Sequence, residues 1–302
     1  MHITIAGKLG SGKSTVGKLL CAEHGFEIYS TGKIQRELAR SFGVSTLEMN
    51  QLMSKDTKYD HMIDDAVTKL SVERENDRLL FDSRMAWHFA KNSFRVFFTI
   101  DPQIAAIRVM KDPRGAEETY VDVDDAREKL IARSLVENER FRTIYGTDNL
   151  NYSNYDLVVD TSYAAPETIA KLVFAEYEKF CADESAYVKK MYFSPKSLYP
   201  SIDAEQISAL DFKSLIHKIQ SEGYIPEPIS AVCIDSYNFV ADGHKRALAA
   251  ANVGLEYITA YLPNEGELEV IKARAAEAGR AAMEAFEARG DFKYPSCPSI
   301  FK

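Results

Sequence analysis

The sequence lacks the features of a secreted, zinc-binding or membrane-spanning chain. Its 302 residues include only four cysteines, far apart and never in C-x-x-C spacing, so reduced thiols are expected rather than disulfides or a zinc site. No apolar stretch approaches the roughly 18 residues that a membrane helix needs, and no signal-peptide pattern opens the chain. The net charge of −8 argues against general binding to nucleic-acid backbones. These absences predict a cytoplasmic protein whose partner is a small molecule.

A glycine-rich loop directly follows an apolar, β-branched run near the start of the chain. Residues 3–6 read I-T-I-A and residues 7–15 read G-K-L-G-S-G-K-S-T, which matches the G-x-x-x-x-G-K-[ST] phosphate-binding pattern. The following residues show helical spacing up to a glycine at position 25. Strand, loop and helix therefore stand in the order that phosphate binding requires. The residues predicted to bind ATP are Gly7, Gly10, Ser11, Gly12, Lys13, Ser14 and Thr15.

The residue types in this loop fit the chemistry of a nucleoside triphosphate with Mg²⁺. The glycines let backbone N–H groups curl around the β-phosphate at the positive end of the helix. Lys13 reaches the β- and γ-phosphate oxygens, and the Ser14 hydroxyl can ligate Mg²⁺. Lys13 is therefore a predicted catalytic residue, and ATP and Mg²⁺ are the predicted cofactors.

Predicted strands and helices alternate over residues 1–180, as in a parallel sheet with helices on both faces. The expected strands are 2–6, 26–29, 78–81, 95–100 and 156–159, and interrupted helix fills the long connection between the second and third. The pattern predicts an α/β fold of the P-loop NTPase type, a three-layer sandwich. With 46% hydrophobic residues, the chain can also build a second core.

The ends of two predicted strands carry candidate acceptor-binding residues. After the second strand, Thr31 stands beside a helix start and Arg36 lies one turn into that helix, where a guanidinium can pair bidentately with a phosphate monoester. The alternative is that Arg36 only pairs with a neighbouring carboxylate. The third strand delivers Asp82 and Arg84 at its C-terminal tip. Asp82 is also predicted to hold Mg²⁺, together with Ser14.

An arginine-rich stretch follows the fourth predicted strand. Phosphoryl transfer spreads negative charge over the phosphate oxygens, so a lid that brings arginines over them stabilises the transition state and excludes water. The predicted catalytic lid residues are Arg133, Arg140 and Arg142. Arg127 is interpreted instead as an ion-pair partner on an exposed helix, and the single tryptophan, Trp87, as a packing residue.

Taken together, these segments resemble the cytidylate kinase family of nucleoside monophosphate kinases, in particular its short archaeal-type members. The resemblance covers residues 1–178 and rests on segments in a consistent order: 7–15, 30–39, 82–87, 139–148 and 155–162. It implies that Lys13 and Ser14 serve ATP and Mg²⁺, that Arg36 and Arg84 hold the acceptor nucleotide, and that the later arginines form the lid. Ser83 stands where the family usually has glycine.

The pattern changes in the second half of the chain. Residues 190–264 contain two short apolar strands and the turn D-G-H-K-R, which opens an alanine-rich helix. This segment resembles the ParB and sulfiredoxin superfamily, which implies a smaller α+β domain. The turn is a predicted second phosphate site of Asp242, Gly243, His244 and Arg246. The alternative is a structural turn in which His244 caps the helix.

Residues 265–302 are expected to form one long amphipathic helix that packs back or dimerises, followed by a tail. The whole sequence predicts ATP-dependent phosphoryl transfer to a nucleoside monophosphate, with CMP or dCMP as the first expectation. Two alternatives stay open. One is a kinase for a non-nucleotide molecule such as free serine, which would use the C-terminal domain, and the other is a nucleotide-switched regulatory protein of the DNA-partition type.

Overall fold

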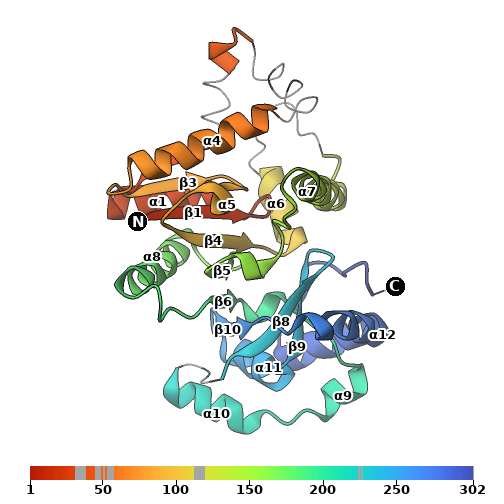
Figure 1. The fold of residues 1–302 in the computed structure, drawn as a ribbon. Coiled ribbons are helices and arrows are strands. Elements are labelled where there is room, and N and C mark those ends of the chain that lie inside the picture. The colour runs from red at the N-terminus through yellow and green to blue at the C-terminus, as the bar shows by residue number, and fades with distance from the viewer. Residues whose placement is uncertain are drawn as a thin grey trace. The chain divides into compact units, whose positions relative to one another are not determined.

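The chain forms two compact units in the computed structural model, which describes residues 1–30, 39–44, 49, 52, 58–111, 120–223, 225 and 227–301, and only the backbone of residues 59, 60 and 265 (Figure 1). The first unit consists of Met1–Phe98, Ser134–Val158 and Ala165–Lys189, and the second of Thr99–Arg133, Val159–Ala164 and Lys190–Lys302. Segments of the two units alternate along the chain. The domains 1–180, 190–264 and 265–302 stay a prediction.

The first unit is built on a sheet with the strand order β2-β3-β1-β4-β5. The pairs β2–β3, β3–β1 and β1–β4 are parallel, and their register sets Ile5 beside Asp82 on one side of β1 and Gly7 beside Phe98 on the other. The end of β1 and the end of β3 therefore lie at the same edge. The strands are β1 (His2–Gly7), β2 (Glu27–Ser30), β3 (Leu79–Asp82), β4 (Ser93–Thr99) and β5 (Leu157–Asp160).

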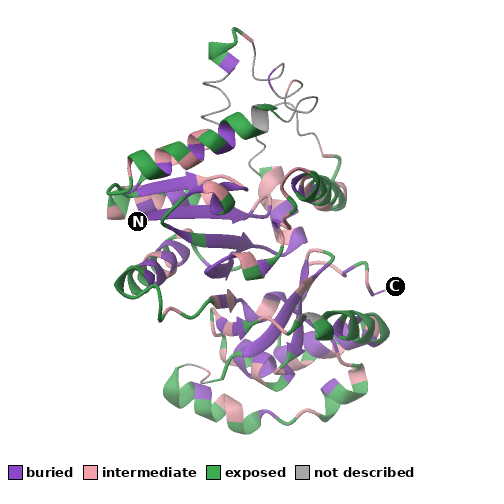
Figure 2. Cartoon of the chain, in the orientation of Figure 1, coloured by how far each residue is buried: buried purple, intermediate pink, exposed green. Residues whose placement is uncertain are grey.

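Burial explains why the apolar run at the start of the chain forms a central strand. All six residues of β1 are buried, including both isoleucines, as expected for a parallel strand covered on both faces (Figure 2). The helix α1 packs against α8, and Ile63 and Val67 of α4 pack with Phe81 in a buried cluster. The helices with residues in this unit are α1 (Lys13–His24), α4 (Lys58–Glu73), α5 (Ala86–Phe89), α7 (Val123–Tyr145), α8 (Pro166–Ala182) and the 3-10 turn η1 (Tyr152–Asn154).

The second unit has a mixed sheet with the order β6-β10-β8-β9-β7. The pairs β6–β10 and β8–β9 are antiparallel, while β10–β8 and β9–β7 are parallel. Its strands are β6 (Lys190–Phe193), β7 (Leu198–Pro200), β8 (Ile229–Ile234), β9 (Tyr237–Asp242) and β10 (Ile258–Tyr261). Its helices are α6 (Pro102–Lys111), the start of α7, η2 (Pro195–Ser197), α9 (Ala204–Ala209), α10 (Lys213–Glu222), α11 (His244–Val253) and α12 (Glu265–Gly290).

The sequence predictions of the main elements are confirmed, with ends displaced by one or two residues. All five strands expected in residues 1–160 are present, and α1 ends at the predicted glycine. The prediction of a single long C-terminal helix is wrong in one respect. Gly279 has φ 66° and ψ −170°, so α12 is two helices joined at a kink, a backbone conformation that the missing Cβ permits. In the described parts of the chain, no helix has the length and apolarity to cross a membrane.

Candidate functional site

The loop between β1 and α1 has the backbone shape of a phosphate cradle. Gly10 and Gly12 adopt the left-handed region with φ of 76° and 79°, which L-residues with a Cβ rarely occupy. The N–H of Ser11 donates to the carbonyl of Lys8, and the Ser11 hydroxyl donates to the same carbonyl at 2.7 Å. Short local hydrogen bonds thus hold the curve of the loop, and Gly12 caps the N-terminus of α1.

Lys13 folds back across this loop. Its Nζ donates to the carbonyl oxygens of Gly7 at 3.0 Å and Lys8 at 3.1 Å. The ammonium group is therefore held by two backbone carbonyl groups at the start of the loop. In phosphate-binding loops of this pattern, the lysine is the residue that reaches the terminal phosphates of a bound nucleotide.

Ser14 and Asp82 meet at the edge of the sheet. The Ser14 hydroxyl donates to Asp82 Oδ2 at 3.0 Å, although the two residues lie 68 positions apart. A hydroxyl and a carboxylate are the oxygen donors that Mg²⁺ takes when its other ligands are phosphate and water. Among the described residues no group of three or more His, Cys, Asp or Glu could hold a metal ion. The pair fits an ion that is shared with a substrate.

Arg84 lies two residues beyond the end of β3 and forms an ion pair with Glu137 of α7. Both side chains are partly buried, with 22% and 28% of their surfaces exposed. No local sequence pattern predicts this contact, because the two residues lie far apart in the sequence. Thr31 and Arg36, the other predicted acceptor-binding residues, lie outside the described residues.

The C-terminal half of α7 is attached to its surroundings in the first unit by further polar contacts. The Tyr145 hydroxyl donates to the buried carboxylate of Asp64 on α4. Arg142 forms an ion pair with Asp148 at 2.5 Å, which holds the pKa of that arginine above its usual range. Arg140 lies over the ring of its neighbour Phe141, at 5.7 Å.

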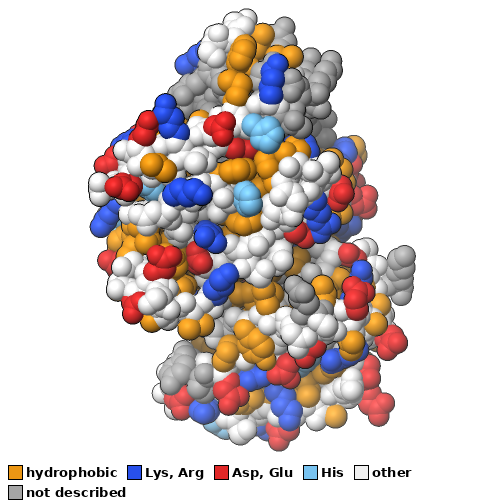
Figure 3. Space-filling model, in the orientation of Figure 1, with side chains coloured by type: hydrophobic (Ala, Val, Ile, Leu, Met, Phe, Trp, Pro, Cys, Tyr) orange, Lys and Arg blue, Asp and Glu red, His pale blue; other side chains and the backbone are white. Residues whose placement is uncertain are grey.

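The predicted lid arginines all have exposed side chains on α7. Arg133 belongs to the second unit, whereas Arg140 and Arg142 belong to the first. Arg142 is engaged with Asp148, as described above. Their assignment as catalytic residues therefore stays a prediction. Acidic and basic side chains are interspersed over the face of the molecule that Figure 3 shows.

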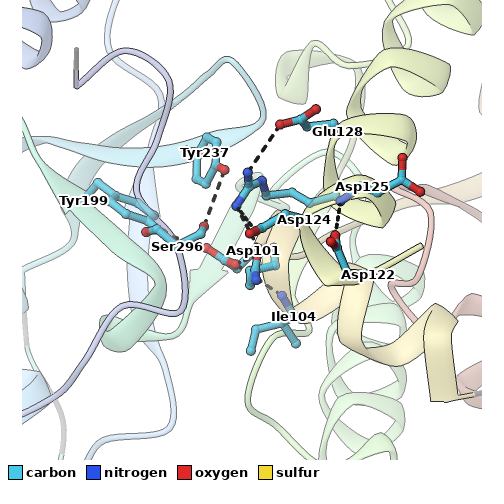
Figure 4. Close-up of polar contacts among 11 residues, drawn as sticks. Asp101, Ile104, Asp122, Asp124, Asp125, Glu128, Tyr199, Tyr237 and Ser296 are labelled. Carbon is cyan, nitrogen blue, oxygen red and sulfur yellow. Dashed lines mark hydrogen bonds and ion pairs between the residues drawn. The ribbon is translucent and has the colours of Figure 1, made fainter. Parts of the chain in front are cut away.

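Arg127 is confirmed as an ion-pair residue of the second unit. Its guanidinium contacts Asp124 at 2.8 Å and Glu128 at 3.7 Å, and it also donates to the side chain of Gln103 (Figure 4). Near this cluster, the buried carboxylate of Asp101 accepts a hydrogen bond from the Tyr199 hydroxyl at 2.8 Å. Burial raises the pKa of Asp101. These contacts tie α6, α7 and β7 together inside the second unit.

Trp87 is confirmed as a packing residue. Its side chain is buried, and its indole N–H donates to Asn149 Oδ1 at 3.1 Å. The hydroxyl of Tyr155 donates to the same oxygen at 2.9 Å. The buried Asn149 side chain thus joins α5 to the segment that follows α7, a role that no local sequence pattern indicates.

The turn at residues 242–246 has two different parts. His244 is buried, and its Nε2 accepts the backbone N–H of Ser201 at 3.1 Å. Burial, and to a lesser extent Arg274, lower its pKa to about 4, so the ring is neutral at pH 7 and does not act as a cation. Arg246 pairs with Asp242 and with Glu227.

The N-terminal cap of α11 is Gly243, which has φ 95°. The alternative prediction, in which His244 caps this helix, is therefore wrong. A Cβ at position 243 would lie 2.7 Å from a methyl group of Ile229 and 2.9 Å from the Arg246 side chain, so glycine is required there. The predicted phosphate site at this turn stays a prediction, but any anion must compete with two carboxylates for Arg246.

The strand, phosphate loop and helix, with a hydroxyl–carboxylate pair beside them, define a P-loop phosphotransferase. Residues 2–163 match the cytidylate kinase-like family, and the chain belongs to that family. The cytidylate kinase of Thermoplasma acidophilum is 34% identical over 174 residues, which cover 56% of this chain and 88% of that protein. The cytidylate kinase of Thermoplasma volcanium is 31% identical over 188 residues, 61% of this chain and 95% of that protein.

Other similarities cover the same part of the chain. An S-adenosylmethionine-dependent nucleotide dehydratase of Lacinutrix mariniflava is 32% identical over 178 residues, which are 59% of this chain and 36% of that protein. Among solved structures, shikimate kinase of Bacteroides thetaiotaomicron aligns with a TM-score of 0.43 and 13% identity over 59% of this chain and 98% of that chain.

Proposed function

We propose that this protein transfers the γ-phosphoryl group of ATP to a nucleoside monophosphate, with CMP or dCMP as the preferred acceptor. The observation that carries the proposal is the Ser14–Asp82 pair at 3.0 Å beside the phosphate loop, with Arg84 two residues further along. The proposed donor site lies at the end of β1, and Arg84, the proposed anion-binding side chain for the acceptor, follows the end of the neighbouring strand β3. The named cytidylate kinases at 31–34% identity support the choice of acceptor.

Each residue of the proposed donor site has a distinct task. The loop backbone orients the β-phosphate, and Lys13 neutralises charge on the β- and γ-phosphate oxygens as the bond to the leaving ADP breaks. Ser14 and Asp82 would hold Mg²⁺, which would offset negative charge on the phosphate groups of the nucleotide. Arg84 would fix the acceptor by its phosphate, so that an acceptor oxygen lies in line with the γ-phosphorus.

The remaining assignments depend on the family resemblance. Thr31 and Arg36 are proposed to complete the acceptor site. Arg133, Arg140 and Arg142 are proposed to approach the transferring phosphoryl group when the substrates are bound. In the conformation described here, Arg142 is held by Asp148, and this ion pair would have to open for the arginine to take that role.

The test is ADP formation from ATP in the presence of CMP, dCMP, UMP, AMP, GMP, free serine or no acceptor. The blank is Lys13→Ala, and the matched control is Lys18→Ala, which removes an exposed lysine from the same helix. Stimulation by one nucleoside monophosphate that is lost in the first variant and kept in the second supports the proposal. Stimulation by serine alone would favour the non-nucleotide alternative, and ATP binding without turnover would favour the regulatory one.

A further inference from the structure

Two buried asparagines connect α5 to α7 within the first unit. Asn138 lies on α7 and Asn149 follows that helix, and the two residues are 5% and 4% exposed. The side chain of Asn138 accepts the backbone N–H of Asn149 at 2.8 Å. Asn149 Oδ1 in turn accepts the indole N–H of Trp87 on α5 at 3.1 Å. A path of hydrogen bonds therefore runs from Asn138 on α7 through Asn149 to Trp87 on α5.

The amide of Asn138 fits this path in one orientation. Its Oδ1 faces the N–H of Asn149, and its Nδ2 donates to Asp148 Oδ1 at 2.9 Å. If the amide were turned over, donor would face donor and acceptor would face acceptor. Asp148 is itself held in place, because its Oδ1 also accepts the backbone N–H of Leu150 at 2.8 Å and its Oδ2 pairs with Arg142. The α7 end of the path is therefore fixed.

The short helix α5 depends on tertiary contacts for its position. It consists of four residues, too few for a helix that is stable by itself. Its Trp87 is buried, and the indole ring packs 5.3 Å from the ring of Tyr155, whose hydroxyl also contacts Asn149 Oδ1. Arg84 lies three residues before Trp87, between the end of β3 and the start of α5. A shift of Trp87 would therefore move the segment that carries Arg84.

We propose that Asn138 and Asn149 are positioning residues of the acceptor site, which act on Arg84 by fixing Trp87 and α5 to α7. This inference rests on the proposed function, because it takes Arg84 as the arginine that binds the phosphate of the acceptor. A guanidinium that pairs with two phosphate oxygens needs a defined orientation, so a small displacement of its backbone weakens the contact. The donor site has its own hydrogen bonds within the phosphate loop and does not depend on this path.

The decisive variant is Asn138→Asp, which keeps the size of the side chain and the acceptor for Asn149 but replaces the donor to Asp148 by a carboxylate oxygen. Two carboxylates that face each other repel, and at lower pH one of them takes up a proton that can restore the lost hydrogen bond. At pH 8 the KM for CMP is expected to rise about three- to tenfold, the effect of one buried hydrogen bond, with the KM for ATP unchanged. At pH 5.5 the KM for CMP should return towards that of the wild type at the same pH.

Trp87→Phe tests the other end of the path and keeps the inference testable if Asn138→Asp does not fold. It removes the indole N–H and retains an aromatic ring, so it should also raise the KM for CMP and leave the KM for ATP unchanged. In the double variant the two effects should be less than additive, because both act on the same path.

The matched control is Asn154→Asp, the same chemical exchange in a neighbouring segment. Asn154 donates to the backbone carbonyl of Asp148 at 2.7 Å, a bond that is not part of the path from Asn138 to Trp87. The KM for CMP should equal that of the wild type in this variant at both pH values.

An unchanged KM for CMP in Trp87→Phe and Asn138→Asp would overturn the inference. An equal rise in the KM for CMP and the KM for ATP would also overturn it, because it would indicate a general loss of packing. Phosphoryl transfer by the wild type would still support the proposed function in both cases. If the wild type phosphorylates no nucleoside monophosphate, the proposed function fails, and the inference fails with it. If another monophosphate is the better acceptor, the same comparison is made with that one.

Discussion

Replacing Gly7 by alanine tests whether the phosphate loop depends on the close contact between its first residue and the neighbouring strand β4. Gly7 is the last residue of β1, pairs with Phe98 of β4 and has φ 145°, in a region that essentially only glycine occupies. An added Cβ would lie 2.4 Å from the carbonyl oxygen of Phe98 and 2.8 Å from its nitrogen. Both are backbone atoms of a buried strand, so neither can turn away as the end of a side chain could.

The expected loss of stability combines two terms. A residue with a Cβ in a sparsely populated backbone region costs about 1–3 kcal/mol, and overpacking a buried contact costs about 1–3 kcal/mol more. The free energy of unfolding should therefore fall by about 2–6 kcal/mol. Gly25→Ala is the control, because Gly25 has φ 70° but nothing lies within 4 Å of its added Cβ. Its cost should be only about 1–2 kcal/mol.

Urea unfolding of both variants measures these losses, and ATP titration measures the effect on the loop. Gly7→Ala should also weaken ATP binding at least about tenfold, since the loop begins at the displaced residue, whereas Gly25→Ala should bind ATP normally. Equal destabilisation by the two substitutions would refute the close-contact argument. Unchanged ATP affinity in Gly7→Ala would show that the shape of the loop does not depend on the close contact between Gly7 and Phe98.

Three other substitutions probe separate parts of the structure. Ser14→Ala removes the hydroxyl beside Asp82 and should lower kcat about 100-fold. Ser14→Thr keeps a hydroxyl and should stay active. A kinase assay at saturating Mg²⁺ compares the two variants, and equal activity would contradict a role for the hydroxyl. Asn149→Ala leaves the buried Trp87 N–H without its acceptor and should lower the free energy of unfolding, measured in urea, by about 1–3 kcal/mol. The fluorescence of this single tryptophan should also shift, and an unchanged spectrum would contradict the contact. Because His244 has a pKa of about 4 when folded and about 6.5 when unfolded, the unfolded state binds more protons, and stability should fall by about 1.4 kcal/mol per pH unit as the pH drops from 6.5 towards 4. His244→Gln should reduce this slope, and an equal slope in both proteins would refute the assignment.

The phosphate loop could be predicted from the sequence because its determinants are local. Nine consecutive residues carry the glycines that permit the curve, the lysine and the hydroxyl, and the apolar run before them identifies the strand. The positions of the five strands of residues 1–160 followed from the same kind of local pattern. The kink at Gly279 shows the limit of local patterns, since an isolated glycine in a helical sequence does not reveal whether the helix continues.

Pairings between distant segments required the tertiary structure. The register of β1 and β3 brings Ser14 to Asp82, and the packing of α7 brings Glu137 to Arg84, a pairing that no local sequence pattern predicts. The state of His244 also depends on burial by distant elements: its residue type and the adjacent basic residues suggested an anion site, but the ring is enclosed and neutral. The sequence by itself therefore determined the chemistry available at the loop and the class of fold. The tertiary structure decided which charges meet, because ion pairing and desolvation depend on distances that only the folded chain establishes.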